Sequence, residues 1–287
     1  MGNEADYSPQ KGTRLHPESV NLIPFTCMKT LVKPLAYLIA LAFFTFACSE
    51  DGHEQPQPQP GKAVNEWGQS MLQIEQIAIE MEQIARGTYP NGSRFLACSS
   101  VQNEATPEGL ETTFTFSGTS PCVDGKTRSG KIIMFTSNNT NLERIIYLDN
   151  YLVNGTRLEG AFAFQLIQVP GKASVIRMVS SNAQVVPTTG GSYRYSLNRV
   201  THLKEGAGTP NDTSDDVVEI YEGEYSCFKH NGAFEASLVT PVVVKKTCNA
   251  ADNLKPVQGK IQMEMTTGQK SILNFGNGTC AAQPFAE

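Results

Sequence analysis

The sequence lacks a hydrophobic stretch long enough to cross a membrane as a helix. Its main apolar run, from Leu35 to Ala47, has 13 residues, whereas a spanning helix needs about 20. The common catalytic signatures are missing as well: there is no G-x-S-x-G elbow, H-E-x-x-H helix, phosphate-binding glycine loop or dinucleotide fingerprint. We therefore expect neither a membrane-spanning helix nor an enzyme, and we expect no cofactor.

Metal-ligand patterns are also lacking. The four histidines, His16, His53, His202 and His230, are isolated from one another, and no two cysteines form a C-x-x-C pair. Because zinc sites are built from closely spaced ligands of these types, we expect no structural metal. His202 and His230 are predicted to be exposed strand-end or turn residues rather than general bases, since no motif supplies an orienting partner.

The chain contains a pattern that is typical of a secretory signal. Residues 28 to 47 comprise a short basic segment, the apolar run and a small residue before a cysteine. Thr45-Phe46-Ala47-Cys48 resembles the lipobox of bacterial lipoproteins, with Thr45 in place of the usual Leu. The resemblance implies cleavage before Cys48 and lipid attachment to its thiol. The alternative is an ordinary secreted protein in which Cys48 is incidental.

The predicted organisation has three parts. Residues 1–47 are an upstream extension and signal peptide, with translation expected to start at Met28 rather than Met1. Residues 48–62 are the lipidated cysteine and a Pro/Gln tether, which such alternation keeps extended. Residues 63–287 are predicted to form the folded domain.

The net charge of the chain and the residues that follow Cys48 limit the classes of partner that we expect. The chain has 23 Lys and Arg and 28 Asp and Glu, and loss of residues 1–47 leaves 19 and 25. This acidic balance argues against nucleic acid as a partner. Ser49, Glu50 and Asp51 resemble the acidic signal that directs lipoproteins of the Bacteroidota to the outer face of the outer membrane. We expect a protein anchored in that membrane through the lipid on Cys48.

An amphipathic helix is predicted at residues 63–86. Apolar side chains recur there at alternating spacings of four and three, and Gly87 follows as a stop signal. The stripe consists of Trp67, Met71, Ile74, Ala78, Met81 and Ala85, widened by Ile77 and Ile84. It is too short to form an independent coiled coil, so we expect it to pack on the rest of the domain.

From about residue 111 the apolar period changes to two, and turn residues recur every eight to twelve positions. Ten strands are predicted, at 112–118, 130–137, 142–153, 155–168, 174–186, 192–203, 217–228, 232–244, 259–266 and 269–275. Short links at Asn154-Gly155, Asn231-Gly232 and Thr267-Gly268 suit tight hairpins. The predicted fold is mainly β, an antiparallel up-and-down meander, either a sandwich or a half-barrel, with one N-terminal helix.

A weak internal repeat suggests how the cysteines pair. FSGTSPC ends at Cys122 near GKIIM at 130–134, while FGNGTC ends at Cys280 after GKIQM at 259–263. Each unit has one upstream cysteine, so we predict disulfides Cys98 with Cys122 and Cys248 with Cys280, leaving Cys227 free. Four cysteines allow three connectivities, and the pairing is a hypothesis at this point.

The segment Cys122-Val123-Asp124-Gly125-Lys126-Thr127-Arg128-Ser129-Gly130-Lys131-Ile132 resembles the C-x-D-G-x-x-R-x-G-K-I signature of a group of uncharacterised surface lipoproteins of Bacteroidota. The end of the domain, Phe275-Gly276-Asn277-Gly278-Thr279-Cys280, resembles their terminal hairpin, although Ala281 replaces the usual acidic residue. The resemblance spans about residues 95–285. It implies surface anchoring and a β fold, and carries no activity.

Three carboxylate patterns are candidate sites. Glu222 and Glu224, with Glu219 nearby, could supply the paired carboxyl groups of a glycosidase, or could simply lie on the solvated face of a sheet. Asp212, Asp215 and Asp216 lie in an oxygen-rich loop without the ligand spacing of a known calcium loop. Asp124 and Arg128 are expected to form a structural ion pair between adjacent strands.

The leading functional expectation is a lipoprotein of the outer membrane or cell surface that is not an enzyme and binds a glycan, a lipid or an envelope protein. One alternative is an acyl-chain carrier in which the helix covers an apolar half-barrel. A further alternative is a polysaccharide hydrolase. An acyl-chain carrier would have an open, apolar sheet face under the helix. A polysaccharide hydrolase would show turnover that depends on Glu222 or Glu224.

Overall fold

The computed structural model describes residues 62–86, 94–138, 143–209, 215–248 and 255–287. All of these residues belong to one compact unit, which begins at Pro56. The predicted signal segment, Cys48 and most of the tether lie outside the described residues, as does Asp212.

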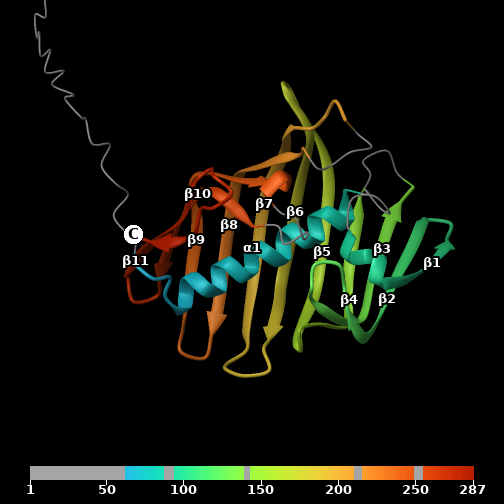
Figure 1. Cartoon of the computed structure of the whole chain (residues 1–287), viewed down its shortest axis with the longest axis horizontal. Helices are drawn as coiled ribbons and strands as arrows, with labels where there is room; N and C mark the ends of the chain where they lie inside the picture. The colour runs from blue at the N-terminus through green and yellow to red at the C-terminus, as the bar shows by residue number, and fades with distance from the viewer. Residues whose placement is uncertain (1–61, 87–93, 139–142, 210–214, 249–254) are drawn as a thin grey trace, which may run out of the picture. The chain divides into compact units, whose positions relative to one another are not determined.

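The domain is one continuous antiparallel sheet in which every strand pairs with the next along the chain (Figure 1). This confirms the predicted meander and identifies a single open sheet rather than a sandwich. Its twelve strands are β1 (Ser99–Ala105), β2 (Gly109–Pro121), β3 (Thr127–Ser137), β4 (Arg144–Val153), β5 (Thr156–Val169), β6 (Lys172–Val186), β7 (Tyr193–Glu205), β8 (Val217–Lys229), β9 (Gly232–Lys245), β10 (Pro256–Met265), β11 (Lys270–Asn277) and β12 (Phe285–Ala286). Short 3-10 turns at Arg94–Cys98 and Lys246–Cys248 carry the two upstream cysteines.

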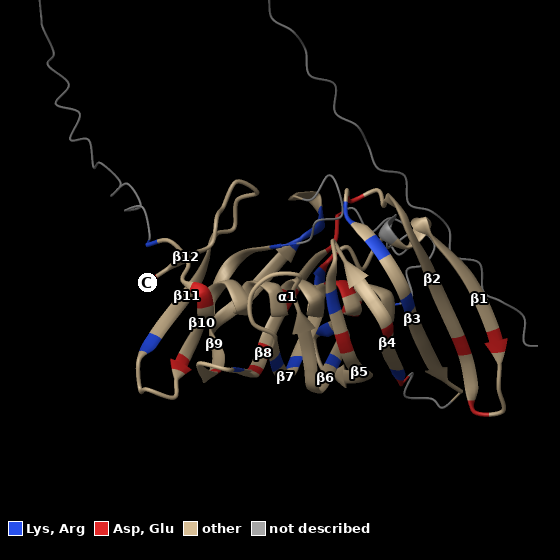
Figure 2. Cartoon of the chain, turned by 90° about the horizontal axis from the view of Figure 1, so that it is seen from below, with Lys and Arg blue, Asp and Glu red and all other residues tan. Residues whose placement is uncertain are grey.

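The two edge strands, β1 and β12, were not predicted from the sequence. β1 has the sequence SSVQNEA, which is mostly polar and mostly exposed, so it has no clear apolar alternation. It nevertheless pairs along its length with β2, Val101 facing Phe114 and Glu104 facing Glu111. Figure 2 marks acidic residues but no Lys or Arg on β1 and β2. Charge of one sign on an edge discourages pairing with another sheet.

Tight turns set the strand register where the sequence predicted them. Asn154 and Gly155 have φ of 49° and 79° between β4 and β5, as a two-residue turn that matches strand twist requires. The turn predicted at Asn231-Gly232 lies one position earlier: β9 starts at Gly232, so His230 and Asn231 form the loop. Gly268 closes a longer turn, its N–H donating to the carbonyl oxygen of Met265 over 2.8 Å.

The helix α1 (Glu66–Ala85) runs across one face of the sheet, from β9 at its start toward β4 and β5 at its end (Figure 1). The Asn65 side chain caps it by accepting the Gly68 N–H over 2.8 Å. The predicted stripe is confirmed: Met71, Ile74 and Met81 are fully buried against the strands. Each such burial contributes about 1.5–3 kcal/mol. Within the described ranges no helix is both long enough and apolar enough to span a membrane.

Both copies of the internal repeat place a glycine at a break in strand register. Gly130 in β3 has φ of 85°, and a Cβ there would lie 2.0 Å from the Asn150 carbonyl oxygen. Gly259 in β10 has φ of 110°, and a Cβ would lie 2.4 Å from the Pro241 carbonyl oxygen. The register of each strand shifts at this glycine. The repeated G-K-I therefore marks a β-bulge where only glycine fits.

The disulfides join the pairs that the repeat predicted. Cys98 is bonded to Cys122 with 5.3 Å between Cα atoms, and Cys248 to Cys280 with 4.9 Å. Cys227 is free and buried, and burial raises the pKa of its thiol to about 12. A thiol that is buried and protonated is a poor nucleophile.

Beneath the middle of α1 lies a buried ion network, the central cluster of Glu75, Glu82, Arg86, Arg199 and Thr201. Arg199 donates to Glu75 over 2.8 Å and to Glu82 over 2.7 Å, and all three side chains are at most 5% exposed. Glu82 also accepts from Arg86 over 2.6 Å and from Thr201 over 2.6 Å. The helix is thus tied to β7 by charge as well as by apolar packing.

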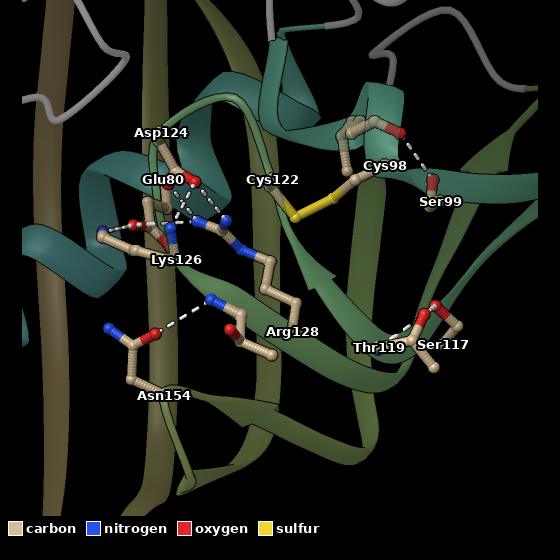
Figure 3. Close-up of a disulfide and its surroundings, with 12 residues drawn as sticks. Glu80, Cys98, Ser99, Ser117, Thr119, Cys122, Asp124, Lys126, Arg128 and Asn154 are labelled. Atoms are coloured by element: carbon tan, nitrogen blue, oxygen red, sulfur yellow. Dashed lines mark hydrogen bonds and ion pairs between the residues drawn. A yellow bond between two sulfur atoms is a disulfide. The ribbon is translucent and has the colours of Figure 1, made fainter.

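A second network, the edge cluster of Glu80, Asp124, Lys126, Arg128 and Tyr151, ties α1 to the turn before β3. The expected ion pair of Asp124 and Arg128 is present, with two bonds of 2.7 and 2.6 Å, but it joins the turn before β3 to β3 itself rather than two adjacent strands. Lys126 donates to Glu80, and Arg128 Nε donates to the Tyr151 hydroxyl over 3.0 Å. Figure 3 shows Glu80, Asp124, Lys126 and Arg128 of this cluster beside the Cys98–Cys122 disulfide. The segment that resembles the C-x-D-G-x-x-R-x-G-K-I signature therefore helps to hold α1 on the sheet.

Candidate functional site

A groove of about 660 Å³ runs beside the first half of α1, in the size range of ligand sites. Gln69, Gln73 and Gln76 lie along its helix wall, because spacings of four and three place them on one side of the helix. The opposite walls come from the loop before β7, the end of β8 and the start of β10. We name this the glutamine groove.

Hydrogen bonds fix part of the glutamine groove. The Tyr193 hydroxyl donates to Gln73 Oε1 over 2.7 Å, which leaves the Gln73 amide N–H groups directed elsewhere. Burial raises the pKa of Tyr193 far above its usual value, so the hydroxyl stays protonated as a donor. Gln69 is exposed, and Gln76 is half-buried. The wall therefore presents amide donors and acceptors, and the amide of Gln73 is held by Tyr193.

The charges at the end of the glutamine groove are partly compensated. Lys229 Nζ donates to Glu66 Oε1 over 2.8 Å and lies 4.9 Å from the centre of the Trp67 ring. This hydrogen bond and the charge of Lys229 lower the pKa of Glu66. Lys255 adds one positive charge at the far wall. The groove is suited to a polar, uncharged or weakly anionic ligand with several hydroxyl or amide groups.

A second groove, the serine trough, lies on the sheet face that is turned away from α1. Its volume is about 620 Å³, and it crosses β6 to β10. Small polar side chains and three carboxylates line it: Ser181, Ser196, Asn198, Ser226, Ser237, Glu224, Glu235 and Glu264. Glu235 and Glu264 are directly opposite each other on neighbouring strands.

Glu222 and Glu224 both lie exposed on the same face of β8. Of the two, Glu224 is the one that lines the serine trough. Glu219 lies further along β8 and is bound by His202 at 3.1 Å and by Lys204 at 2.8 Å. The trough instead brings Glu224 together with Glu235 and Glu264, which lie on other strands and which the sequence pattern did not connect.

The prediction for His202 was wrong. It lies inside β7, is only 8% exposed, and pairs with Glu219. A bulge in the pairing of β7 with β8 at Val200 and Thr201 alters the alternation that the sequence suggested. His230 does lie exposed in a turn, as expected.

The acidic loop before β8 has structural partners at its described end. Thr209 Oγ1 donates to Asp215 over 2.9 Å, and Asp216 pairs with Lys246 at 3.2 Å. Among the residues that the structure places, no group of three His, Cys, Asp or Glu is arranged to hold a metal ion.

Comparison with known proteins adds no relative: no family model, no curated protein and no solved structure matches the chain significantly. Functional inference therefore rests on the geometry of this chain and on its sequence.

Proposed function

We propose that this chain is a lipid-anchored protein of the outer membrane that binds a hydroxyl-rich ligand, a glycan in the first instance, in the glutamine groove and does not turn it over. The observation that carries the proposal is the row of Gln69, Gln73 and Gln76 facing a groove of about 660 Å³. An amide offers both a donor and an acceptor, which matches sugar hydroxyl groups that do the same. The lipobox-like Cys48 and the extended tether support the location.

The acyl-carrier alternative is less well supported. The sheet face beneath α1 is occupied by side chains of the helix, including Met71, Ile74 and Met81, which are fully buried. The small hollow that remains beside Glu82 and Arg199 measures about 30 Å³, space for little more than one or two water molecules. An acyl chain would require α1 to leave the sheet and would expose the central cluster.

The hydrolase alternative has one specific observation in its favour, the three carboxylates of the serine trough. A glycosidase acid needs a raised pKa, which burial commonly provides, yet Glu224, Glu235 and Glu264 are all exposed. Glu264 also pairs with Lys270 at 3.1 Å. Loss of turnover on a glycan panel after Glu224→Gln or Glu222→Gln would revive this alternative. Absence of any turnover in the unmodified protein would retire it.

Binding is tested by titrating a panel of neutral oligosaccharides into the full chain and into a Gln69→Ala/Gln73→Ala/Gln76→Ala variant. Losing several hydrogen bonds of about 0.5–1.5 kcal/mol each should weaken binding at least tenfold. Gln262→Ala, on the opposite sheet face, is the matched control and should bind normally. Equal binding by both variants would exclude the glutamine groove as the site.

The anchor is tested separately by intact mass and detergent partitioning of the protein from its native host, with and without Cys48→Ala. A lipid-modified species that begins at Cys48 and is lost in the variant supports the proposed location. A soluble, unmodified species would contradict it and would leave the glutamine groove to be tested on its own.

A further inference from the structure

At the other end of α1 a second hollow contains an arginine, Arg144, that has no counterion among the described residues. The hollow measures about 150 Å³, enough for more than one water molecule. Its polar and charged lining comes from α1 and from strands β4 to β6: Arg86, Arg144, Gln165 and Ser174.

Arg144 is the first residue of β4 and extends from the helix-covered face of the sheet. Its Nε is buried and has no hydrogen-bond partner. No carboxylate pairs with its guanidinium in the part of the chain that the structure describes. Burial lowers the pKa of Arg144, and no anionic neighbour offsets this effect. Arg144 is half-buried, and its buried Nε is the atom left without a partner. Buried polar groups are almost always hydrogen-bonded, so this arrangement is costly in the protein without a ligand.

The carboxylates of the two ion clusters under α1 are already paired with other cations. Glu75, Glu82, Glu80 and Asp124 are paired with the cations of the central and edge clusters, two carboxylates and two cations in each. Segments 87–93 and 139–142, which adjoin the hollow in sequence, contain no Asp or Glu. The carboxyl end of α1 offers about half a negative charge, which Arg86 already shares. Neither cluster therefore leaves a carboxylate for Arg144.

The wall opposite Arg144 is fixed in an unusual backbone conformation. Ser174 has φ of 48°, in the left-handed region that serine rarely adopts. Both its carbonyl oxygen and its hydroxyl accept from Arg86 Nη1 over 3.1 Å. Strained residues of this kind cluster at functional sites. Here the backbone conformation of Ser174 presents the two acceptors that hold Arg86 at one rim of the hollow. Arg144 lies at the other rim.

We propose that this hollow binds the oxyanion group of a ligand, a carboxylate or a phosphate, with Arg144 as its counterion. Ala85, Phe164, Leu166 and Ile176 supply apolar wall, so the ligand carries an apolar part next to its anionic group. The site is separate from the glutamine groove and does not depend on it.

The test uses calorimetric titration of the full chain with acetate, octanoate and inorganic phosphate at constant ionic strength. At least one of these probes should bind saturably, and Arg144→Met should weaken that binding at least tenfold. Arg194→Met, an exposed arginine of β7, is the matched control and should leave binding unchanged. Tighter binding of octanoate than of acetate identifies a carboxylate with an apolar tail, whereas a preference for phosphate identifies a phosphorylated ligand.

Thermal unfolding without ligand gives an independent readout. Because Arg144 is uncompensated in the ligand-free protein, Arg144→Met should raise the melting temperature, while a structural arginine would lower it on removal. No saturable binding of any probe, equal binding by the Arg144→Met variant, or a lower melting temperature in that variant would overturn the proposal.

Discussion

The central and edge clusters both fasten α1 to the sheet, but they differ in what lies beside them. In the central cluster, Arg199 and Glu75 are completely buried and rely on each other. In the edge cluster, Arg128 and Asp124 are just as buried, and each cluster has one cation at its margin, Arg86 at 13% exposure and Lys126 at 15%. The edge cluster also lies beside the Cys98–Cys122 disulfide, as Figure 3 shows. The same residue types are thus used in both places, and one of the two lies next to a covalent cross-link.

This difference determines what each cluster costs when it is broken. Ion pairs gain little at a surface, while a buried charge that loses its partner has no water to replace it. The central cluster should therefore be intolerant of single substitutions but tolerant of complete replacement. In the edge cluster, Asp124 keeps a hydrogen bond from the Lys126 backbone N–H, and its turn is cross-linked at Cys122, so the losses there should be moderate and should depend on the state of the disulfide.

The largest effect is expected for Arg199→Met. It leaves Glu75 buried without its cation, while Glu82 keeps Arg86 and Thr201, and the free energy of unfolding should fall by about 3–5 kcal/mol. Urea unfolding measures the change. Combining the substitution with Glu75→Met and Glu82→Leu should recover most of the loss, since well-packed apolar side chains can replace a buried ion network. If the triple variant is less stable than Arg199→Met alone, the network stabilises the fold in its own right.

Removal of the disulfides comes next. Cys98→Ala/Cys122→Ala opens a loop of sequence separation 24, and Cys248→Ala/Cys280→Ala one of 32. In the chain-entropy view each change costs about 3–4 kcal/mol. The first should cost more than its loop length implies, because Cys122 starts the turn that positions Asp124. Equal losses in urea unfolding would mean that the bond does not support the edge cluster.

Peptide mapping without reduction checks the pairing directly. Peptides linking Cys98 to Cys122 and Cys248 to Cys280 are expected, with Cys227 alkylated only after unfolding. Cys227 in a disulfide would refute the arrangement.

A moderate effect is expected for Arg128→Met. Asp124 and Tyr151 lose their partner, but Lys126 still pairs with Glu80. The free energy of unfolding should fall by about 1–3 kcal/mol, typical of leaving a hydrogen-bonding group unsatisfied. In a cycle with Glu80→Gln, the two losses should be less than additive because both residues belong to one network. Strict additivity would show that Glu80 and Arg128, 3.6 Å apart, are not coupled.

The strands and the helix could be predicted because their side chains follow simple periods. All ten predicted strands correspond to β2 to β11. β1 was missed because its polar sequence has no period, and its pairing comes from its neighbour β2. The disulfide pairing followed from the repeat, and the structure explains that repeat through the bulges at Gly130 and Gly259.

The ion clusters and the grooves were harder to predict. No pattern in the sequence singled out Glu75, Glu80 and Glu82, and all three are buried. One signal was available: Arg199 alternates in phase with the apolar residues Tyr195 and Leu197 of β7. A cation in a buried row requires an anion from the element that covers it. The glutamine groove gave no such signal, because its walls come from segments far apart in sequence.

The smallest expected effect is a difference between Glu75 and Glu82 of the central cluster in how each makes stability depend on pH. Burial raises the pKa of Glu75 above its ordinary 4.5, and Arg199 offsets this only in part. For Glu82, burial acts in the same direction but is outweighed by Arg86 and Arg199, so its pKa is lowered. Protonated Glu75 therefore contributes stability that is complete below about pH 4.5 and is lost as the pH rises through its folded pKa. Ionised Glu82 contributes stability above about pH 4.5 that is lost as the pH falls.

Unfolding free energies measured between about pH 4 and about pH 8 should thus diverge for the two amide variants. Relative to the unmodified chain, Glu75→Gln should gain stability as the pH rises, and Glu82→Gln should lose it. Each unit of pKa shift corresponds to about 1.4 kcal/mol, so the divergence measures how differently the interior treats two carboxylates bound to one arginine. Parallel curves would mean that Arg199 holds both glutamates ionised, and the central cluster would then behave like the edge cluster, where bonds from Arg128 lower the pKa of Asp124 despite its burial.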